Sequence, residues 1–226
     1  MNKKIYITES QARKILEARK DGFRLDGLLN QTFAAKIRYC KEWLGQPIGN
    51  GSSRTVFQMD DYSVLKLAKN AKGIAQNEDE YRVGTDNYLS IFPKILNGTD
   101  ETNFSWIISE FVIPAKVKDF KEVLNMDFED VKDFCLYVQL SSRGDYGKSY
   151  GKKIQEIYSK YEENEDATYL LNDLYELCYG YYYSIGDAMR IANWGMCMRD
   201  GYPEMVLLDS GLSNDTYEKY YRRWQN

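Results

Sequence analysis

The sequence contains no histidine among its 226 residues. This absence excludes Ser-His-Asp triads, Cys-His pairs and metal sites built on histidine. Any acid–base chemistry would have to use carboxylates, lysine, tyrosine or cysteine. The four cysteines include no CxxC pair, so neither a zinc site nor a thioredoxin-like motif is indicated. We therefore expect reduced thiols, which are typical of a cytoplasmic protein.

The sequence also lacks a long apolar run and a strong charge of either sign. No segment approaches the ~20 apolar residues that a membrane-spanning helix needs. Residues 1–5 lead into a charged segment rather than into the apolar core of a signal peptide. The formal net charge of −4 provides no basic surface for nucleic acid or for an anionic membrane. We therefore expect neither of these among the partners.

What is present is typical of a globular protein with a substantial core. Hydrophobic residues make up 43% of the sequence and charged residues 28%. Apolar spacing and capping signals predict helices over residues 8–19, 30–44, 71–89, 128–140 and 167–183. Strand patterns occur over 55–59, 62–67, 95–96, 104–110, 194–198 and 205–208, with turn signals between them. The polar, glycine-containing segment 141–165 predicts a partly mobile insertion.

This order of elements predicts three regions. Residues 1–45 would form an N-terminal helical extension, and residues 46–113 a β-rich lobe of two hairpins with one helix between them. Residues 114–226 would form a mostly helical lobe that carries one late hairpin. The chain is therefore predicted to be an α+β protein in two lobes.

A glycine-rich segment opens the β-rich region. It reads Ile48-Gly49-Asn50-Gly51-Ser52-Ser53-Arg54 and is followed by a strand pattern. Two glycines at this spacing allow a sharp turn and a close approach of the backbone to another group. Backbone N–H groups in such a turn can cradle phosphate oxygens. A tight turn between two strands explains the same glycines without any ligand, so both interpretations stay open here.

A lysine interrupts the apolar strand that follows. Lys66 lies between Leu65 and Leu67, and a buried ammonium without a partner is unfavourable. A carboxylate from the next predicted helix could pair with it, and both Glu80 and Glu78 are candidates. An edge-strand lysine that reaches solvent is the alternative.

Acidic and amide side chains gather late in the sequence. Asp187 follows Gly186, Asn193 lies six residues later, and Asp209 ends an apolar strand before Ser210-Gly211. Carboxylate and amide oxygens are ligands that magnesium accepts, so Asn193 and Asp209 are candidate metal ligands. Asp187 is a candidate base for a hydroxyl group. An Asx turn would explain any one of them alone.

The order of these motifs resembles the protein-kinase-like superfamily over roughly residues 46–212. The resemblance is closest to small phage-type kinase-like proteins and to aminoglycoside-phosphotransferase-like enzymes. It implies a two-lobed fold with a β-rich N-lobe and a minimal, mostly helical C-lobe, a cytoplasmic location (that of the host if phage-encoded), and ATP and Mg²⁺ as cofactors. The resemblance implies that Gly49, Gly51 and Ser52 lie at the phosphates, and that Lys66 contacts the phosphates and pairs with Glu80. It implies that Glu110 and Val112 lie at the adenine. Asp187 would be the catalytic base, and Asn193 and Asp209 would hold the metal.

The sequence departs from the family pattern at several positions. Arg54 replaces the third glycine of the loop, Ile185 replaces the catalytic-loop histidine, and Ser210 replaces the phenylalanine of Asp-Phe-Gly. Three functions therefore stay open. The first is an ATP-dependent phosphotransferase that acts on a hydroxyl of a protein or a small molecule. The second is a pseudokinase-type binding or regulatory module without catalysis, and the third is a structural protein that reuses the fold.

Overall fold

The computed structural model describes residues 22–85, 88–98, 103–142, 147–208 and 213–220. The chain is a mixed α+β protein with several helices and two sheets, each of which contains antiparallel strand pairs. It divides into two compact units. The first comprises residues 1–77 and 96–109, and the second comprises residues 78–95 and 110–226.

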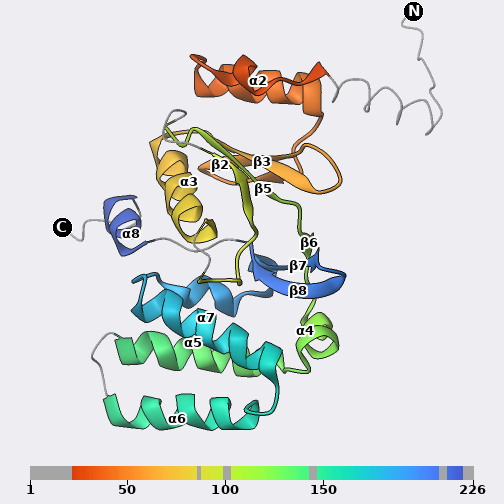
Figure 1. The fold of residues 1–226 in the computed structure, drawn as a ribbon. Helices are drawn as coiled ribbons and strands as arrows, with labels where there is room; N and C mark the ends of the chain where they lie inside the picture. The colour runs from red at the N-terminus through yellow and green to blue at the C-terminus, as the bar shows by residue number, and fades with distance from the viewer. Residues whose placement is uncertain (1–21, 86–87, 99–102, 143–146, 209–212, 221–226) are drawn as a thin grey trace, which may run out of the picture. The chain divides into compact units, whose positions relative to one another are not determined.

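The first unit is built on a five-stranded sheet whose strand order is β1-β2-β3-β5-β4. Its three inner strands, β2, β3 and β5, are labelled in Figure 1. Its elements are η1 (Leu25–Leu28), α2 (Phe33–Leu44), β1 (Gly49–Asn50), β2 (Arg54–Gln58) and β3 (Ser63–Ala68), followed by α3 (Ala71–Gly84), β4 (Ile95–Asn97) and β5 (Trp106–Glu110). Three of these, α3, β4 and β5, continue into the second unit.

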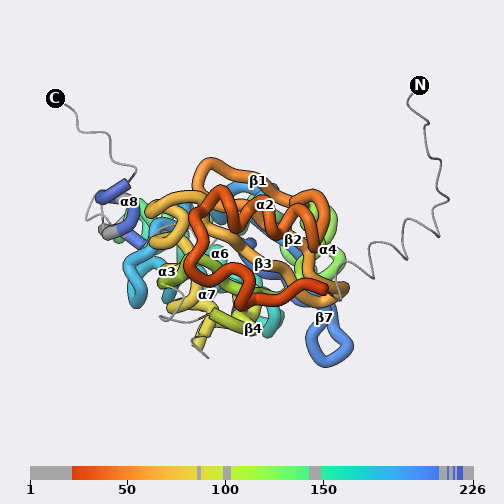
Figure 2. The backbone as a smooth tube through the Cα atoms, turned by 90° about the horizontal axis from the view of Figure 1, so that it is seen from above, coloured from red at the N-terminus to blue at the C-terminus, as the bar shows by residue number. Residues whose placement is uncertain are grey.

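Helix α2 covers one face of this sheet, as Figures 1 and 2 show. The helix begins after Thr32, whose side-chain oxygen accepts a hydrogen bond from the backbone N–H of Ala35 and so caps the first turn. Its inner face, alternate residues of β2, β3 and β5, and the preceding segment form one apolar cluster. From the preceding segment come Phe23 and Leu28, and from the helix and strands come Cys40, Leu44, Phe57, Leu65, Leu67, Trp106 and Ile108. Because side chains alternate across a strand, the intervening residues of β3 lie on the opposite face of the sheet.

The second unit combines helices with a small sheet of order β6-β7-β8. Its remaining elements are β6 (Ile113–Pro114), α4 (Val117–Leu124), α5 (Phe128–Ser142), α6 (Gly147–Lys160), α7 (Glu165–Tyr179), η3 (Ile185–Met189), η4 (Ile191–Asn193), β7 (Trp194–Arg199), β8 (Tyr202–Leu207) and α8 (Asn214–Tyr220).

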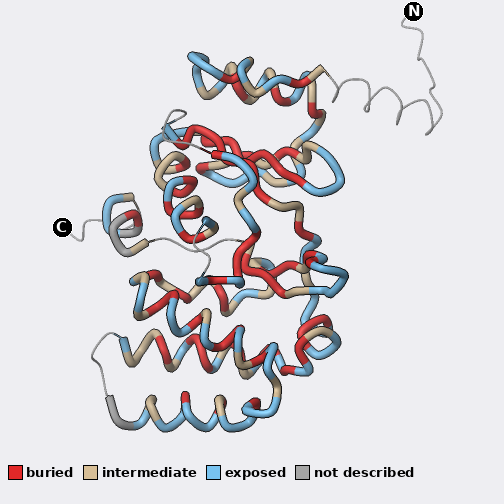
Figure 3. The backbone as a smooth tube through the Cα atoms, viewed as in Figure 1, coloured by how far each residue is buried: buried red, intermediate tan, exposed pale blue. Residues whose placement is uncertain are grey.

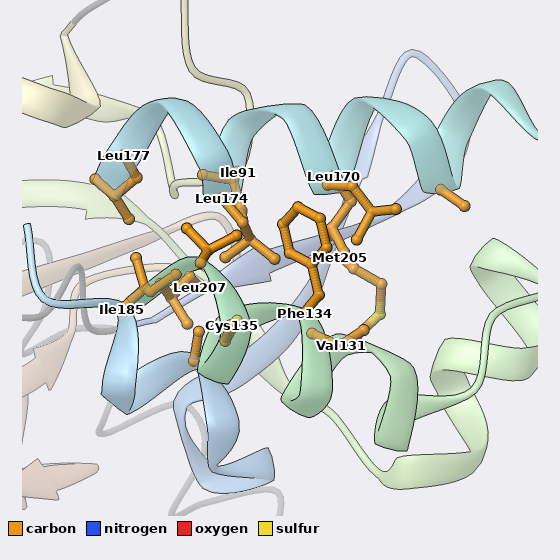
Figure 4. Packing of buried hydrophobic residues seen from close by; sticks show 14 of the residues in the cluster. Ile91, Val131, Phe134, Cys135, Leu170, Leu174, Leu177, Ile185, Met205 and Leu207 are labelled. Carbon is orange, nitrogen blue, oxygen red and sulfur yellow. The ribbon is translucent and has the colours of Figure 1, made fainter. Parts of the chain in front are cut away.

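The core of the second unit lies between α5, α7 and β8. The buried side of each helix faces this core, as the red segments of Figure 3 show. Figure 4 shows the packing directly, with α5 contributing Val131, Phe134 and Cys135, α7 contributing Leu170, Leu174 and Leu177, and Met205, Leu207, Ile185 and Ile91 completing the cluster.

The late hairpin is confirmed. Strands β7 and β8 pair in antiparallel register from Trp194 opposite Leu207 to Arg199 opposite Tyr202. The turn between them consists of Asp200 and Gly201, with φ angles of 51° and 86°. Both residues are in the left-handed region, which matches a two-residue hairpin turn.

The predicted hairpins of the β-rich region lie in a single sheet. Strands β2 and β3 form the first hairpin, and β5 and β4 are neighbours, as expected. The structure also joins β3 to β5, with the N–H of Ala68 donating to the carbonyl of Ser105 at 2.9 Å. Two predicted helices end earlier than expected. Helix α3 ends at Gly84, where a Cβ would lie 2.6 Å from Ile95, and α7 ends before Gly180.

The predicted mobile insertion over residues 141–165 is wrong for most of its length. Residues 147–160 form helix α6, whose Ile154 and Ile157 are buried in the core of the second unit, as is Tyr161 just beyond it. The glycines and polar residues of this segment dominate its sequence pattern, so the short apolar stripe of the helix was not recognised. The predicted helix over residues 8–19 lies outside the described residues.

Candidate functional site

The glycine-rich segment and the strand lysine lie in register on adjacent strands. Gly49 of β1 pairs with Val56 of β2, and Val56 pairs in turn with Lys66 of β3. With neighbouring strands about 4.8 Å apart, this row places Lys66 two strands from the glycine. Lys66 is 7% exposed, so its ammonium-bearing side chain belongs to the buried part of the sheet.

The turn that follows Gly49 is closed by the backbone. The N–H of Gly51 donates to the carbonyl of Arg54 at 2.9 Å, and the N–H of Ile48 donates to the carbonyl of Val56 at 2.9 Å. Ser52 lies at the exposed tip of this turn. The loop is therefore a tight β-hairpin with its central residues open to solvent.

Two side chains after β3 hold this loop. Lys69 donates from Nζ to the carbonyl of Gly51 at 2.8 Å and to Oδ1 of Asn50 at 3.2 Å. Asn70 donates from Nδ2 to the carbonyl of Ser52 at 3.3 Å. These contacts fix the position of the loop backbone, and the sequence motifs did not identify either residue.

The packing of the protein itself does not require either loop glycine. A Cβ at Gly49 would meet Val56 at 3.5 Å, and one at Gly51 would meet only the Arg54 carbonyl oxygen at 3.8 Å. Neither residue is among the glycines with a positive φ. The tight-turn interpretation of these glycines therefore has no steric basis in this fold.

The helix after Lys69 is much more buried than its acidic sequence indicates. Glu80 is 2% exposed and Asp79 5%, whereas Glu78 is exposed. Asn77 is fully buried, and its Nδ2 donates to the carbonyls of Lys66 at 3.3 Å and Phe104 at 2.8 Å. The buried glutamate is thus Glu80.

Asp187 belongs to the second unit and lies in η3. Ile185 and Ala188, on either side of it, are buried in the core, and the indole Nε1 of Trp194 donates to the carbonyl of Ala188 at 2.7 Å. The Asp187 carboxylate itself is 40% exposed and lies 3.7 Å from the guanidinium of Arg190. A rigid turn therefore presents this carboxylate to solvent.

Asn193 connects this turn to the end of β8. Its Nδ2 donates to the backbone carbonyl of Asp187 at 3.0 Å, and its own carbonyl accepts from the N–H of Leu208 at 2.7 Å. Asp209, the other candidate metal ligand, lies outside the described residues. Within the described part of the chain, no group of three or more His, Cys, Asp or Glu residues is arranged to hold a metal ion.

The segment from Glu110 to Val112 links β5 to β6. The N–H of Glu110 donates to the carbonyl of Lys94 at 2.9 Å, and its carboxylate forms an ion pair of 2.9 Å with Arg199. Val112 is buried in a small cluster with Cys197 and Val206. Both ends of this linker are therefore anchored to neighbouring elements.

Asp79 is a buried carboxylate that the motif pattern did not single out. Its Oδ2 accepts hydrogen bonds from the N–H and the hydroxyl of Ser213, at 3.1 and 2.9 Å, and its backbone carbonyl accepts from the Tyr183 hydroxyl at 3.1 Å. Burial raises the pKa of the Tyr183 phenol, and the nearby Asp79 charge raises it further. An acidic helix face is normally exposed, so only the tertiary structure identifies this role.

The site residues therefore fall into two sets. The first unit contains Gly49, Gly51, Ser52 and Lys66, and the second contains Glu80, Glu110, Val112, Asp187 and Asn193.

Comparison with known proteins gives no family: no protein-family model matches the chain, and no curated protein matches its sequence. Among the helices of the described residues, none is long and apolar enough to cross a membrane.

Proposed function

We propose that this chain is a kinase-like phosphotransferase, with a two-lobed protein-kinase-like fold, that binds ATP with Mg²⁺ and moves the γ-phosphate to a hydroxyl of a protein or a small molecule. The observation that carries the proposal is the row of Gly49, Val56 and Lys66 across three strands. Because the packing requires neither Gly49 nor Gly51, a close approach by an external group accounts for them better than the turn does. A polyphosphate beside a buried lysine fits both features.

The second support comes from the turn that carries Asp187. Asn193 ties this turn to Leu208, the residue before Asp209, so Asp187 and Leu208, 21 positions apart along the chain, are connected by side-chain and backbone hydrogen bonds through Asn193. The Asn193 amide uses its nitrogen in that contact, which leaves its oxygen as the atom for a ligand. The proposed magnesium ligands are this oxygen and the Asp209 carboxylate.

In the proposed reaction the acceptor hydroxyl oxygen bonds to the γ-phosphorus as the bond from that phosphorus to the β–γ bridging oxygen breaks. The products are the phosphorylated acceptor and ADP. The Asp187 carboxylate orients the hydroxyl and takes its proton. Lys66 neutralises charge on the phosphates, and the loop N–H groups position them. Magnesium, when bound, neutralises the charge on the phosphate oxygens.

A nucleotide-binding module without catalysis is the second candidate. The observation that favours it is the contact of 3.7 Å between the Asp187 carboxylate and the Arg190 guanidinium. That cation competes with an acceptor hydroxyl for the carboxylate. Both groups are substantially exposed, so solvent screens the pair and the competition is weak.

Nucleotide binding is tested by thermal shift with ATP, with and without magnesium. The wild type is expected to be stabilised at millimolar concentration, as mass action requires of a ligand that binds the folded state. The variant Lys66→Ala is expected to lose this stabilisation, and Lys41→Ala, which changes an exposed lysine of α2, to keep it. An unchanged melting temperature of the wild type with Mg-ATP would refute both candidate functions.

Catalysis is tested by phosphate release and by phosphate transfer to the protein itself. Asp187→Asn removes the proton acceptor and is expected to reduce turnover by about 10²-fold or more while ATP still binds. Asp133→Asn, at an exposed position of α5, is the matched control. Equal turnover in the wild type and Asp187→Asn would contradict the assignment of the base.

A further inference from the structure

The second unit contains a cavity of about 500 Å³. Helices α4 and α7, strand β8 and residues 90–91 line it, and among the described residues that line it, none is proposed for phosphate transfer. Its buried apolar lining residues are Ile91, Leu124, Leu170 and Met205, three of which are labelled in Figure 4. A cavity of this size with an apolar lining and a few polar groups is typical of a ligand site.

The wall of this cavity formed by α7 is acidic and aromatic. Asp166, Tyr169 and Asp173 line it, and their spacing of three and four residues puts them on one face of the helix. Asp166 is exposed, and Tyr169 is 64% exposed. No lysine or arginine of the described chain lines the cavity. The wall therefore presents two negative charges that no lining cation offsets.

Asp173 has one carboxylate oxygen occupied and one open. Its Oδ2 accepts hydrogen bonds from the N–H and hydroxyl of Ser90 and from the N–H of Ile91, at 2.8 to 3.0 Å. All three donors are neutral, and no described residue donates to Oδ1. Burial raises the pKa of this carboxyl group, while the hydrogen bonds from Ser90 and Ile91 lower it. The carboxylate is thus fixed in position, and a cation beside Oδ1 would stabilise its charged form.

Strand β8 adds backbone groups that no other strand pairs with. The N–H of Leu207 donates to the carbonyl of Ile91 at 2.7 Å, on the side away from β7. Because alternate residues of an antiparallel strand point the same way, the N–H and carbonyl of Met205 and the carbonyl of Pro203 also face away from β7. None of these three groups has a hydrogen-bond partner among the described residues. Met205 and Pro203 line the cavity, so the edge of β8 is open there.

We propose that this cavity is a docking site for an extended segment of a partner protein that carries arginine or lysine next to apolar residues. The backbone of the segment pairs with Met205 and Pro203, as in strand addition to a sheet edge. Its cation binds Asp173 and Asp166, and its apolar side chain fills the buried lining. The rings of Tyr169 and Tyr202, both largely exposed, add contact area for the cation.

Two features of the cavity select this occupant. Open backbone donors and acceptors at a strand edge favour a peptide over a small organic cation, which has no backbone to pair with them. The unpaired carboxylates favour a basic peptide and repel nucleic acid and anionic lipid. The third acidic lining residue, Glu204, is already paired at 2.8 Å with the buried Arg199, so Asp166 and Asp173 carry the selectivity. The inference does not depend on the proposed function.

The test measures Kd by calorimetry for three probes and the full-length protein. The first probe is a short capped peptide of alternating valine and arginine, and the second has glutamine in place of each arginine. The third is the capped single amino acid N-acetylarginine amide. We expect the arginine peptide to bind at least about tenfold more tightly than either of the others, the factor that one charge-assisted hydrogen bond represents.

Two variants assign this binding to the cavity. Asp173→Asn removes the charge and keeps an oxygen to accept from Ser90 and Ile91, and it is expected to weaken the arginine peptide about tenfold without changing the glutamine peptide. Glu165→Gln, at an exposed neighbouring position of α7 outside the lining, is the control and is expected to keep the affinity within about twofold. If Asp173→Asn does not fold, Asp166→Asn decides the question in the same comparison.

Four results would overturn the inference. Equal affinity for the arginine and glutamine peptides would show that the carboxylates do not select a basic segment. N-acetylarginine amide binding as tightly as the peptide would make the cavity a site for small cations. Equal effects of Asp173→Asn and Glu165→Gln would place the peptide elsewhere on the surface. No binding of the arginine peptide at about 1 mM would remove the docking site, whether or not the protein binds ATP.

Discussion

The side-chain amide of Asn193 donates a hydrogen bond of 3.0 Å to the backbone carbonyl of Asp187, six residues earlier in the chain. The backbone carbonyl of Asn193 accepts from the N–H of Leu208. One asparagine therefore sets the conformation of the turn that carries the exposed carboxylate and connects it to the end of β8. The amide nitrogen is committed to this contact, which directs the amide oxygen elsewhere.

Replacement of Asn193 is expected to affect metal-dependent binding more than folding. Asn193→Ala removes one part-buried hydrogen bond and should lower the free energy of unfolding by about 1 kcal/mol. The additional thermal stabilisation that magnesium gives in the presence of ATP should disappear, while the effect of ATP alone persists. Asn172→Ala, at an exposed position of α7, serves as the control. Full magnesium dependence in Asn193→Ala would exclude it as a ligand.

An added methyl group in the glycine loop separates ligand binding from folding. Gly51→Ala meets no close contact and no left-handed φ, so the variant should be as stable as the wild type or more stable by about 0.4–1 kcal/mol. ATP affinity measured by calorimetry should nevertheless fall, because the methyl group occupies space at the loop backbone.

Gly201→Ala is the converse control for this loop variant. Gly201 has open space around it but a φ of 86°, so an alanine there should lower stability without changing ATP affinity. Undiminished ATP affinity in Gly51→Ala would show that the loop does not approach the ligand.

Asp79 is a buried carboxylate whose replacement should destabilise the protein. Its Oδ2 accepts two hydrogen bonds from Ser213 and is held in a nearly buried position. Asp79→Ala leaves those donors without this acceptor and should lower the free energy of unfolding by about 1–3 kcal/mol in urea denaturation. Glu156→Ala, on the surface of α6, should change it by less than about 0.5 kcal/mol. Similar values for both variants would contradict a structural role for Asp79.

The buried thiol of Cys40 should make the protein less stable at alkaline pH. Burial raises its pKa from 9.0 to about 12. Above pH 9 the thiol of the unfolded chain loses its proton while that of the folded chain keeps it, so stability falls as pH rises from 9 to 12. The slope from this one group is at most about 1.4 kcal/mol per pH unit.

Cys40→Ala should reduce the alkaline slope when urea unfolding is compared at pH 8 and pH 10. The other titrating groups are unchanged in this variant, so the difference between the two proteins reports Cys40 alone. An identical slope in both proteins would mean that the thiol is not protected by burial.

Much of the secondary structure could be predicted from local pattern. The capping threonine and apolar stripe of α2, the strands on both sides of Asp60-Asp61, and the Asp200-Gly201 turn depend on neighbouring residues along the chain. Such signals are local, because propensity, capping and turn geometry act within a few residues. The polar segment 147–160 was the exception, since the spaced apolar side chains Ile154 and Ile157 were enough to dock it as α6.

The candidate site also has features that the sequence predicts and features that depend on the tertiary structure. The order of Gly49, Gly51, Lys66, Asp187 and Asn193, and the absence of histidine, are properties of the sequence alone, and the absence limits acid–base chemistry to carboxylate, lysine, tyrosine and cysteine groups. The strand register and the burial of side chains cannot be obtained from the sequence alone, because both depend on residues distant in the chain. Only the tertiary structure places Val56 between Gly49 and Lys66, buries Glu80 while exposing Glu78, and joins Asn193 to Leu208.

Dependence on distant residues also explains why no motif indicated the burial of Asp79 and Arg199. A charged residue in a sequence is expected at the surface, because burial without partners is unfavourable. Here the partners come from up to 134 positions away, as Ser213 does for Asp79, and from 89 positions away, as Glu110 does for Arg199. The sequence alone thus determined the chemical groups and the local elements of this protein. The tertiary structure decided which charges are buried and which backbone groups they hold, because long-range hydrogen bonds offset their desolvation.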